Sequence, residues 1–344
     1  MYLLAASRRL SRHAPSAASR RTLKLLVGAT ARPHSEKVFG EDAYFASASD
    51  GTLGVADGVG GSKREGVDPG DFSRRLCAYA AEAARSSSAA ASVAVARRRS
   101  TEDDLCRRGG SSTLLVARLD GDTLEVCNFG DSGAALFRPS PRTSAGSVGM
   151  VPRTVLRTAD QTHYFNCPFQ ASAEDDLAEP LLGACGADAL AATARVGDVV
   201  VLATDGFWDN VHDEETRAIL SDRIAVLWAS AAKQQAFGPL SDRVRDFSSD
   251  AEAGDDAADV LDATADALAA AAAAVFDDAE AVTPFTLGAR ADGLHAPGGK
   301  EDDLTVVVAL VVDDAVEHTA RDAARRDNFG AAGLDDGATP PGAS

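Results

Sequence analysis

The chain has 344 residues, 45% of them hydrophobic, so it can bury a core as one large domain or two small ones, and no apolar run is long enough to cross a bilayer. A net charge of −18 argues against nucleic-acid binding as the main function, because a phosphate backbone would be repelled. The cysteines are odd in number and form no CxxC pair, which indicates free thiols in a reducing compartment rather than a disulfide framework or a zinc site: Cys77, Cys106, Cys127, Cys167 and Cys185.

The first 35 residues contain no acidic side chain. They are rich in serine, threonine and alanine, and their basic residues are Arg8, Arg9, Arg12, Arg20, Arg21, Lys24 and Arg32. This composition is typical of a mitochondrial or chloroplast transit peptide, and the alternative is a disordered basic leader. We expect residues 1–35 to be such a segment.

Hydrophobic patterning predicts seven strands, several of them joined by short turns, which favours antiparallel meanders over βαβ units. The expected strands are 43–47, 52–56, 113–119, 123–129, 134–138, 199–203 and 304–312. Helices are predicted at about 69–85, 213–232 and 257–276. Residues 86–100, of low complexity, and 140–151, rich in Ser, Pro and Gly, are expected to be weakly ordered.

The stretch LGVADGVGG, residues 53–61, ends an apolar strand on Asp57 and continues almost without side chains. A carboxylate at a strand end beside bare backbone can present oxygen ligands to a hard metal ion. An ordinary Asp-Gly turn is the alternative, and for a single such dipeptide it is the commoner case.

Asp57 is not alone, because acidic residues stand at the ends of several other predicted strands. They are Glu41 and Asp42 in GEDAYF, Asp131 in NFGDSGAALF, Asp205 in VVLATDGF, and Asp302 and Asp303 in KEDDLTVVV. Carboxylates that converge on one sheet edge repel each other unless cations are present, and oxygen ligands without His or Cys favour magnesium or manganese over zinc. In so acidic a chain, turn residues such as Asp120, Asp122 and Asp198 are more simply solvated.

These motifs, in this order and together with GSSTLLVARL, resemble those of the metal-dependent PPM family, the type 2C serine/threonine protein phosphatases. The resemblance covers about residues 37–312, and GVDPGDFSRRL and ADQTHYFNCPFQ resemble its organellar, chiefly mitochondrial subgroup. It implies an α+β fold, a four-layer α/β/β/α sandwich of two antiparallel sheets flanked by helices. The phosphatase domain would span 36–315, followed by a C-terminal tail, 316–344, with a disordered end.

The resemblance also assigns roles to single residues. Asp57 would bridge two Mn²⁺ or Mg²⁺ ions, with the carbonyl of Gly58 on one of them. Glu41 and Asp42 would serve the second metal, Asp205 and Asp302 the first, Asp131 a weaker third ion, and Asp303 occupies the position that is often asparagine. Lys37 stands where many members have a phosphate-binding arginine.

The implied reaction is hydrolysis of phosphoserine and phosphothreonine by a hydroxide that bridges the two ions. Val59 replaces the histidine proposed as general acid in many members, and His163 is a candidate substitute, although packing is the commoner role of a lone histidine. No CxxxxxR loop is present, which excludes a cysteine phosphatase. A catalytically weak or dead PPM-fold scaffold remains the alternative, while a calcium-binding structural protein would need DxDxDG loops, which are absent.

The implied partners are phosphoprotein substrates, expected to be organellar enzymes. The expected location is the mitochondrial matrix, with the plastid as the alternative.

Overall fold

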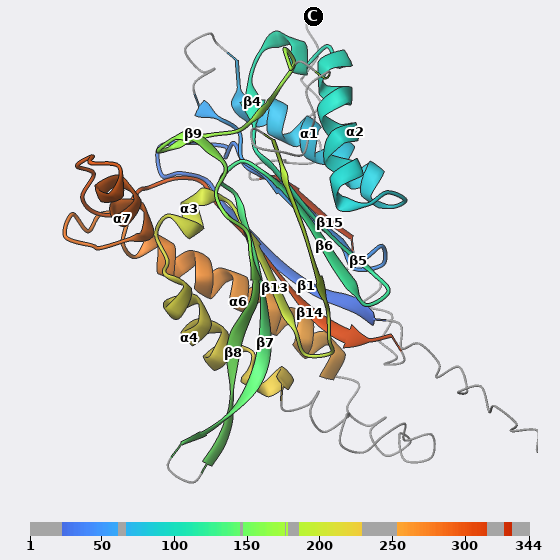
Figure 1. Cartoon of the computed structure of the whole chain (residues 1–344), viewed down its shortest axis with the longest axis vertical. Coiled ribbons are helices and arrows are strands. Elements are labelled where there is room, and N and C mark those ends of the chain that lie inside the picture. The colour runs from blue at the N-terminus through green and yellow to red at the C-terminus, as the bar shows by residue number, and fades with distance from the viewer. Residues whose placement is uncertain are drawn as a thin grey trace, which may run out of the picture.

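The computed structural model describes residues 23–60, 67–144, 147–175, 177, 186–228, 253–314 and 327–331. Two antiparallel sheets pack face to face, and helices cover the outer face of each (Figure 1). This is the predicted four-layer α/β/β/α sandwich. Among the described helices, none combines the length and the hydropathy that a bilayer crossing needs.

The first sheet has five strands in the order β1-β14-β13-β7-β8, all paired antiparallel. Their bounds are β1 Leu23–Arg32, β7 Gly133–Ser144, β8 Ser147–Arg157, β13 Val199–Ala203 and β14 Leu304–Asp313. The outer face is covered by α4 (Asp213–Arg223) and α6 (Ala253–Ala273), and the short helix α3 (Asp205–Trp208) follows β13 directly.

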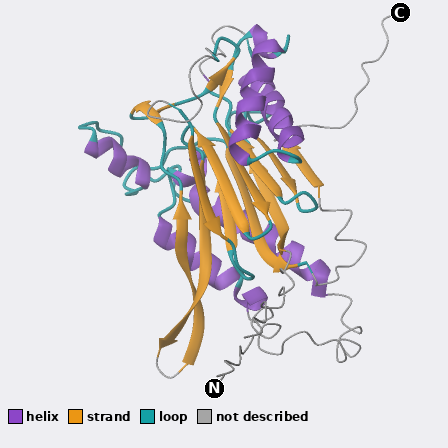
Figure 2. Cartoon of the chain, turned by 45° about the vertical axis from the view of Figure 1, so that its right-hand side comes forward, coloured by secondary structure: helices purple, strands orange, loops and turns teal. Residues whose placement is uncertain are grey.

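The second sheet has six strands in the order β12-β6-β5-β3-β2-β15. Their bounds are β2 Ala43–Ser47, β3 Thr52–Ala56, β5 Leu114–Asp120, β6 Thr123–Phe129, β12 Asp188–Thr193 and β15 Asp327–Ala331. Helices α1 (Pro69–Ala84) and α2 (Ala89–Glu102) pack on its outer face, where Figure 2 shows them side by side.

Smaller elements connect these layers at one end of the molecule. They are the 3₁₀ turn η2 (Cys106–Arg108), the strands β4 (Ser111–Ser112), β9 (Thr162–Tyr164), β10 (Cys167–Pro168) and β11 (Ala171–Ser172), and the helix α7 (Pro284–Ala291). Strand β10 pairs with β9, and β11 pairs with β4.

The core lies in three layers, and β14 shows why its sequence reads as one unbroken apolar run. Val306, Val308 and Leu310 face the helices α4 and α6, whereas Val307, Ala309 and Val311 face the other sheet. Side chains alternate between the two faces of a strand, so a strand buried on both faces has no polar positions.

Strand β1 corrects the expectation that residues 1–35 form a leader. Its residues pair with β14 along the full length of both strands, from Leu23 opposite Asp313 to Arg32 opposite Leu304. Leu25 is buried in the core between the sheets. Only residues 1–22 of the expected leader lie outside the described residues.

Two stretches expected to be weakly ordered are also regular. Residues 89–102 form α2, which Ser88 caps by accepting a hydrogen bond from the Ala91 amide at 3.2 Å. Most of 140–151 belongs to the β7–β8 hairpin, which projects beyond its sheet in Figure 1. Alanine favours a helix, and an edge strand of a hairpin tolerates Ser and Pro. The composition of these two stretches therefore led to a wrong prediction of weak order. The C-terminal tail likewise contains a strand, β15, which pairs with β2.

Candidate metal centre

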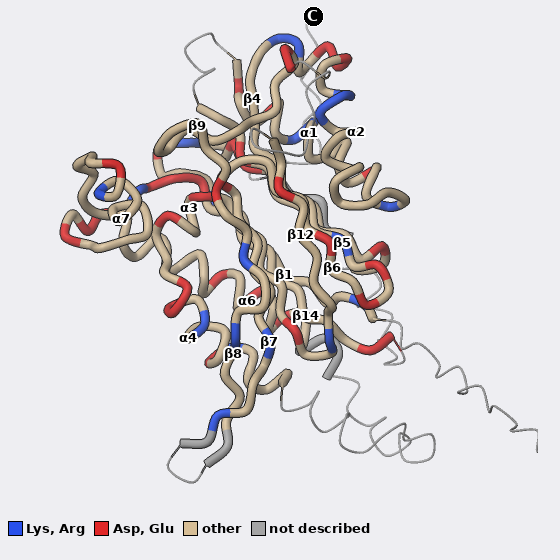
Figure 3. The backbone as a smooth tube through the Cα atoms, in the orientation of Figure 1, with Lys and Arg blue, Asp and Glu red and all other residues tan. Residues whose placement is uncertain are grey.

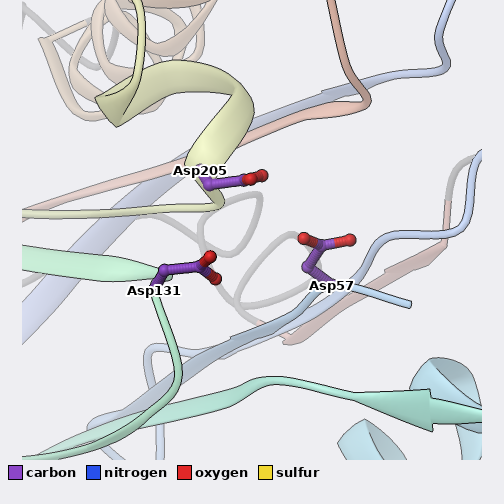
Figure 4. Close-up of side chains that lie close together, drawn as sticks. All are labelled: Asp57, Asp131 and Asp205. Carbon is purple, nitrogen blue, oxygen red and sulfur yellow. The ribbon is translucent and has the colours of Figure 1, made fainter. Parts of the chain in front are cut away.

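Three aspartates from three strand ends meet at one end of the sandwich. Asp57 follows β3 of the second sheet, whereas Asp131 precedes β7 and Asp205 follows β13, both in the first sheet. Each offers a carboxylate oxygen that lies within 4.8 Å of the other two. Figure 4 shows the three side chains pointing into one shared space, so both sheets contribute to the site.

Burial makes these carboxylates costly in the absence of cations. Asp131 and Asp205 are only 8% and 7% exposed. Burial raises the pKa of Asp57 well above its usual range, and the neighbouring charges of Asp205, Asp42, Asp302 and Asp131 raise it further. The pKa of Asp131 is raised by burial and then by Asp205.

Several buried carboxylate oxygens have no hydrogen-bond donor among the described residues: Asp42 Oδ1, Asp131 Oδ1 and Asp205 Oδ1. A buried polar atom left without a partner costs free energy, whereas a divalent cation would satisfy several such oxygens together. The donor set is oxygen only, which suits Mg²⁺ or Mn²⁺. The residues present therefore fit the metal ions that the sequence predicts. In Figure 3 acidic positions gather around α3, at this end of the molecule.

Glu41 and Asp42 lie just before β2 and are both buried. Asp42 Oδ2 accepts a hydrogen bond from Thr204 Oγ1 at 2.8 Å, which joins it to the residue before Asp205. The pKa of Asp42 is raised by burial and by the charge of Asp303. The backbone carbonyl of Glu41 accepts bonds from the Gly58 amide at 3.2 Å and from the Ser73 hydroxyl, which fixes Glu41 beside the Asp-Gly turn.

Gly58 has no room for a side chain. A Cβ built there would lie 2.7 Å from the carbonyl oxygens of Glu41 and Pro69. The turn of residues 57–58 is held from the other side as well, because the Asp57 amide donates to Thr113 Oγ1 at 3.1 Å. Glycine is therefore required at position 58 by close packing.

Asp303 binds groups of the chain itself with both oxygens. Its Oδ1 accepts from the His34 amide at 2.7 Å, and its Oδ2 accepts from the Glu41 amide at 2.7 Å and from Lys37 Nζ at 2.9 Å. Lys37 Nζ also contacts Glu41 Oε2 at 2.7 Å. In this arrangement Asp303 orients Lys37 and Glu41.

Asp302 precedes Asp303 in the chain and interacts electrostatically with Asp205. Its Oδ1 accepts from the Asp303 amide at 2.9 Å. Burial raises the pKa of Asp302 to about 6, with the charge of Asp205 adding to the rise. The predicted metal ligands thus surround the same acidic centre.

Two residues of the centre were missed from the sequence, Lys300 and Asp209. Lys300 Nζ contacts Asp205 Oδ2, Asp209 Oδ2 at 2.8 Å and Asp302 Oδ2 at 3.5 Å. Burial opposes the charge of Lys300, but these three carboxylates outweigh it and raise the pKa of Lys300 above its usual value. Asp209 could have been found, because it follows Asp205 by one helical turn and shares its face.

The contacts and pKa values of the remaining candidate residues indicate structural roles rather than acid–base or nucleophilic catalysis. The His163 ring stands edge-on against Phe169, with centroids 4.4 Å apart, which agrees with a packing role. Phe207 and Trp208 are buried in the core, and Trp208 Nε1 donates to the Gly133 carbonyl at 3.0 Å. Burial raises the pKa of the Cys106 and Cys127 thiols to about 12, so neither is a thiolate nucleophile at neutral pH.

Comparison with known proteins gives the family. No family model matches the chain. It is 31% identical over 322 residues to "Probable protein phosphatase 2C 26" of Arabidopsis thaliana, covering 88% of this chain and 90% of the relative. It is 33% identical over 293 residues to "Probable protein phosphatase 2C BIPP2C1" of Oryza sativa subsp. japonica, which covers 84% of this chain but only 43% of that longer protein. The "Protein phosphatase PTC7 homolog" of Homo sapiens is 29% identical, with 80% of each chain covered.

Solved structures agree with the fold. The photosystem II phosphatase PBCP superposes with a TM-score of 0.60 and 26% identity, covering 83% of this chain and 98% of that one. The catalytic domain of the serine threonine protein phosphatase PstP, solved in complex with two manganese ions, superposes with a TM-score of 0.50 and 19% identity, covering 85% and 100%. The chain therefore belongs to the protein phosphatase 2C family of serine/threonine protein phosphatases.

Proposed function

We propose that this chain hydrolyses phosphoserine and phosphothreonine in protein substrates with the help of two manganese or magnesium ions. The observation that carries the proposal is the meeting of Asp57, Asp131 and Asp205, whose oxygens lie within 4.8 Å of one another; Asp57 is half-buried and the other two are buried. A scaffold that had lost catalysis would have no reason to keep this costly set of charges. Since the chain spans 43% of the rice relative, its substrates and partners are proposals too.

The two ions, when bound, would lower the pKa of a water molecule and neutralise the phosphoryl oxygens. Asp57 would contribute to holding both ions, because its carboxylate lies within 4.8 Å of those of Asp131 and Asp205 and the charge of Asp42 also raises its pKa. Glu41 and Asp42 would hold one ion, and Asp205, Asp302 and the Gly58 carbonyl the other. A weaker third ion at Asp131 stays a prediction.

Lys37 would bind the substrate phosphate. Its ammonium is held by Glu41 and Asp303, so it is positioned at the edge of the centre before substrate arrives. A lysine gives a point charge without the bidentate geometry of an arginine, so we expect it to contribute to substrate affinity more than to turnover. No general acid is assigned, because the side chain of Val59 has no ionisable group and His163 packs on Phe169.

We also propose that the protein acts in an organelle, with mitochondrial matrix phosphoproteins as substrates. The support is the acid-free, basic N-terminal sequence and the motifs that resemble the organellar subgroup. The similarity to a photosystem II phosphatase keeps the plastid as the alternative. Because residues 23–32 form β1, the segment to test is 1–22: fused to a fluorescent protein it should enter mitochondria, and a cytosolic fusion would reject the targeting proposal.

The phosphatase proposal is tested with purified protein and a phosphoserine peptide. We expect hydrolysis with Mn²⁺, loss of hydrolysis in EDTA, and recovery when Mn²⁺ is restored. A phosphotyrosine peptide and an unphosphorylated one serve as substrate controls. Undiminished turnover in EDTA would contradict the proposal.

A further inference from the structure

Two apolar side chains stand exposed between Lys37 and Glu41. Val38 is 84% exposed and Phe39 is 55% exposed, and Val38 is the most exposed large apolar side chain of the described residues. A single exposed apolar side chain is common on a protein surface. This pair, however, directly follows the residue proposed to bind phosphate and ends two residues before a proposed metal ligand. The Val38–Phe39 pair therefore adjoins the candidate metal centre.

The segment that carries the pair is held at both ends. Asp303 accepts hydrogen bonds from the His34 amide and from the Glu41 amide, each at 2.7 Å, so one carboxylate joins the two sides of the segment. Between them, the Gly40 carbonyl accepts from Arg74 Nη1 at 3.3 Å. The pair thus has a defined position beside the centre, and its exposure is not that of a chain end.

The charges around the pair do not favour an acidic ligand. Lys37 lies in this segment and Arg74 contacts it, but each is paired with two carboxylates, which are Glu41 and Asp303 for the lysine and Asp68 and Asp71 for the arginine. Glu36, which is exposed, adds a negative charge directly before Lys37. An acidic side chain placed here would be repelled, whereas an apolar one would cover apolar surface.

We propose that Val38 and Phe39 bind an apolar side chain of the protein substrate, within two residues of the phosphorylated serine or threonine. This inference rests on the proposed phosphatase function. Consecutive Cα atoms are about 3.8 Å apart, so Phe39 lies within about 8 Å of Lys37, a distance that two residues of a bound peptide also cover. Contact with such a residue would remove both side chains from water and so add to substrate affinity.

The test compares three phosphoserine peptides that differ only at the two positions on each side of the phosphoserine, where they carry leucine, serine or aspartate. With Mn²⁺, kcat/KM should be about 10-fold higher for the leucine peptide than for the serine peptide, and lowest for the aspartate peptide. In Val38→Ser/Phe39→Ser the leucine-to-serine ratio should fall to about one, because the apolar contact is lost. Phe39→Leu keeps an apolar side chain and should keep most of the preference.

Val226→Ser is the matched control. Val226 is 59% exposed, but it lies close in the chain to Trp228, whose Nε1 donates to the Gly197 carbonyl at 2.9 Å. Gly197 precedes β13, whereas Asp205 follows that strand, so Val226 belongs to the opposite end of the sheet. This variant should keep the leucine-to-serine ratio of the unmodified protein.

Equal kcat/KM for the leucine and serine peptides would overturn the proposal, as would a preference that Val38→Ser/Phe39→Ser leaves unchanged. A preference that appears only after removal of residues 1–22 would make that segment the occupant of the pair. A dimer that the double variant dissociates would make a second copy of the chain the occupant. Either result would also overturn the proposal.

Failure of the proposed function gives a different result, which is that none of the three peptides is hydrolysed. Fluorescence anisotropy of labelled peptides then measures binding directly, because the peptides are not consumed. The Kd of the leucine peptide should be about 10-fold lower than that of the serine peptide, and Val38→Ser/Phe39→Ser should remove the difference. Equal Kd values in the unmodified protein would reject the binding role of the pair.

Discussion

At the scale of single residues, Asp57 is the side chain on which the centre depends most. It comes from the second sheet and lies close to Asp131 and Asp205 of the first, and burial together with Asp205 raises its pKa. Asp57→Asn should lower phosphatase activity by more than about 100-fold, since it removes the charge shared between the two proposed ions. The fold should persist, because a carboxylate among other carboxylates does not stabilise the protein when metal has been removed. Circular dichroism checks the fold, and near-normal turnover at saturating Mn²⁺ would refute the bridging role.

Two other carboxyl groups of the centre, those of Asp209 and Asp302, predict how the stability of the metal-free protein depends on pH. Burial raises the pKa of Asp209 to about 7, with Asp205 adding to the rise against the opposing charge of Lys300, and burial raises that of Asp302 to about 6. A carboxyl group with a raised pKa binds its proton more tightly in the folded chain than in the unfolded one, so ionisation costs stability.

In EDTA, the unfolding temperature should therefore fall as pH rises from about 5 through 6 and 7 to 8. Asp209→Asn should flatten this dependence, because the group that titrates near neutrality is gone. Excess Mn²⁺ should raise the unfolding temperature most at the upper end of the range, where the ligands are ionised. An unfolding temperature in EDTA that rises with pH across this range would show that the raised pKa values are wrong.

At the scale of elements, β1 and α6 fit together through a single glycine. A Cβ at Gly28 would lie 2.2 Å from the Asp262 amide nitrogen and 2.3 Å from the Leu261 carbonyl carbon. Gly28→Val should therefore push α6 from the sheet and destabilise the fold by about 3 kcal/mol. Gly149→Ala is the matched control, because nothing lies within 4 Å of a Cβ at that exposed position. Chemical denaturation of both variants measures the difference, and equal stabilities would mean that β1 does not pack against α6 as described.

A truncation series tests the same strand without introducing a clash. Removal of residues 1–22 should leave the described fold and the activity intact, whereas removal of residues 1–30 deletes most of β1 and its pairing with β14. The second truncation should expose the apolar edge of β14 and lose soluble, folded protein. Equal activity in the two truncated proteins would show that β1 is dispensable.

The sequence predicted most strands of both sheets because their residues follow a clear pattern. β2, β3, β6 and β13 have the predicted bounds, since each is a largely apolar or an alternating run ended by turn residues. β1 could not be predicted in the same way, because its Lys24 and Arg32 share the acid-free composition of the leader before it. Its place depends on β14, nearly 300 residues later in the chain, and such long-range pairing leaves no local signal.

The residues of the candidate site likewise divide into those that the sequence predicts and those that it does not. The aspartates at strand ends were found because Asp-Gly after an apolar run is a readable local pattern. Lys300 was not found, because a lysine followed by three acids in KEDD reads as a solvated turn. Asp205 and Asp209 precede Lys300 by more than 90 residues in the chain, and only the fold brings them into contact with it.

At the scale of the whole molecule, the function of the two sheets is to hold strand ends together. Asp57 comes from one sheet and Asp131 and Asp205 from the other, so the site exists only when both sheets pack. The layer between the sheets, with Leu53, Leu115 and Val307, is apolar and lies behind the carboxylates. Binding of metal at this end should therefore stabilise the entire sandwich rather than one loop.

The most direct test of the account follows metal binding and catalysis in one titration. Protein stripped with EDTA receives Mn²⁺ in steps, and at each step bound metal and the initial rate on a phosphoserine peptide are measured. We predict that the rate rises in parallel with occupancy and that Asp57→Asn loses both tight binding and the rate. A full rate before metal binds, or unchanged binding and rate in Asp57→Asn, would contradict the claim that these strand-end aspartates form the catalytic metal centre.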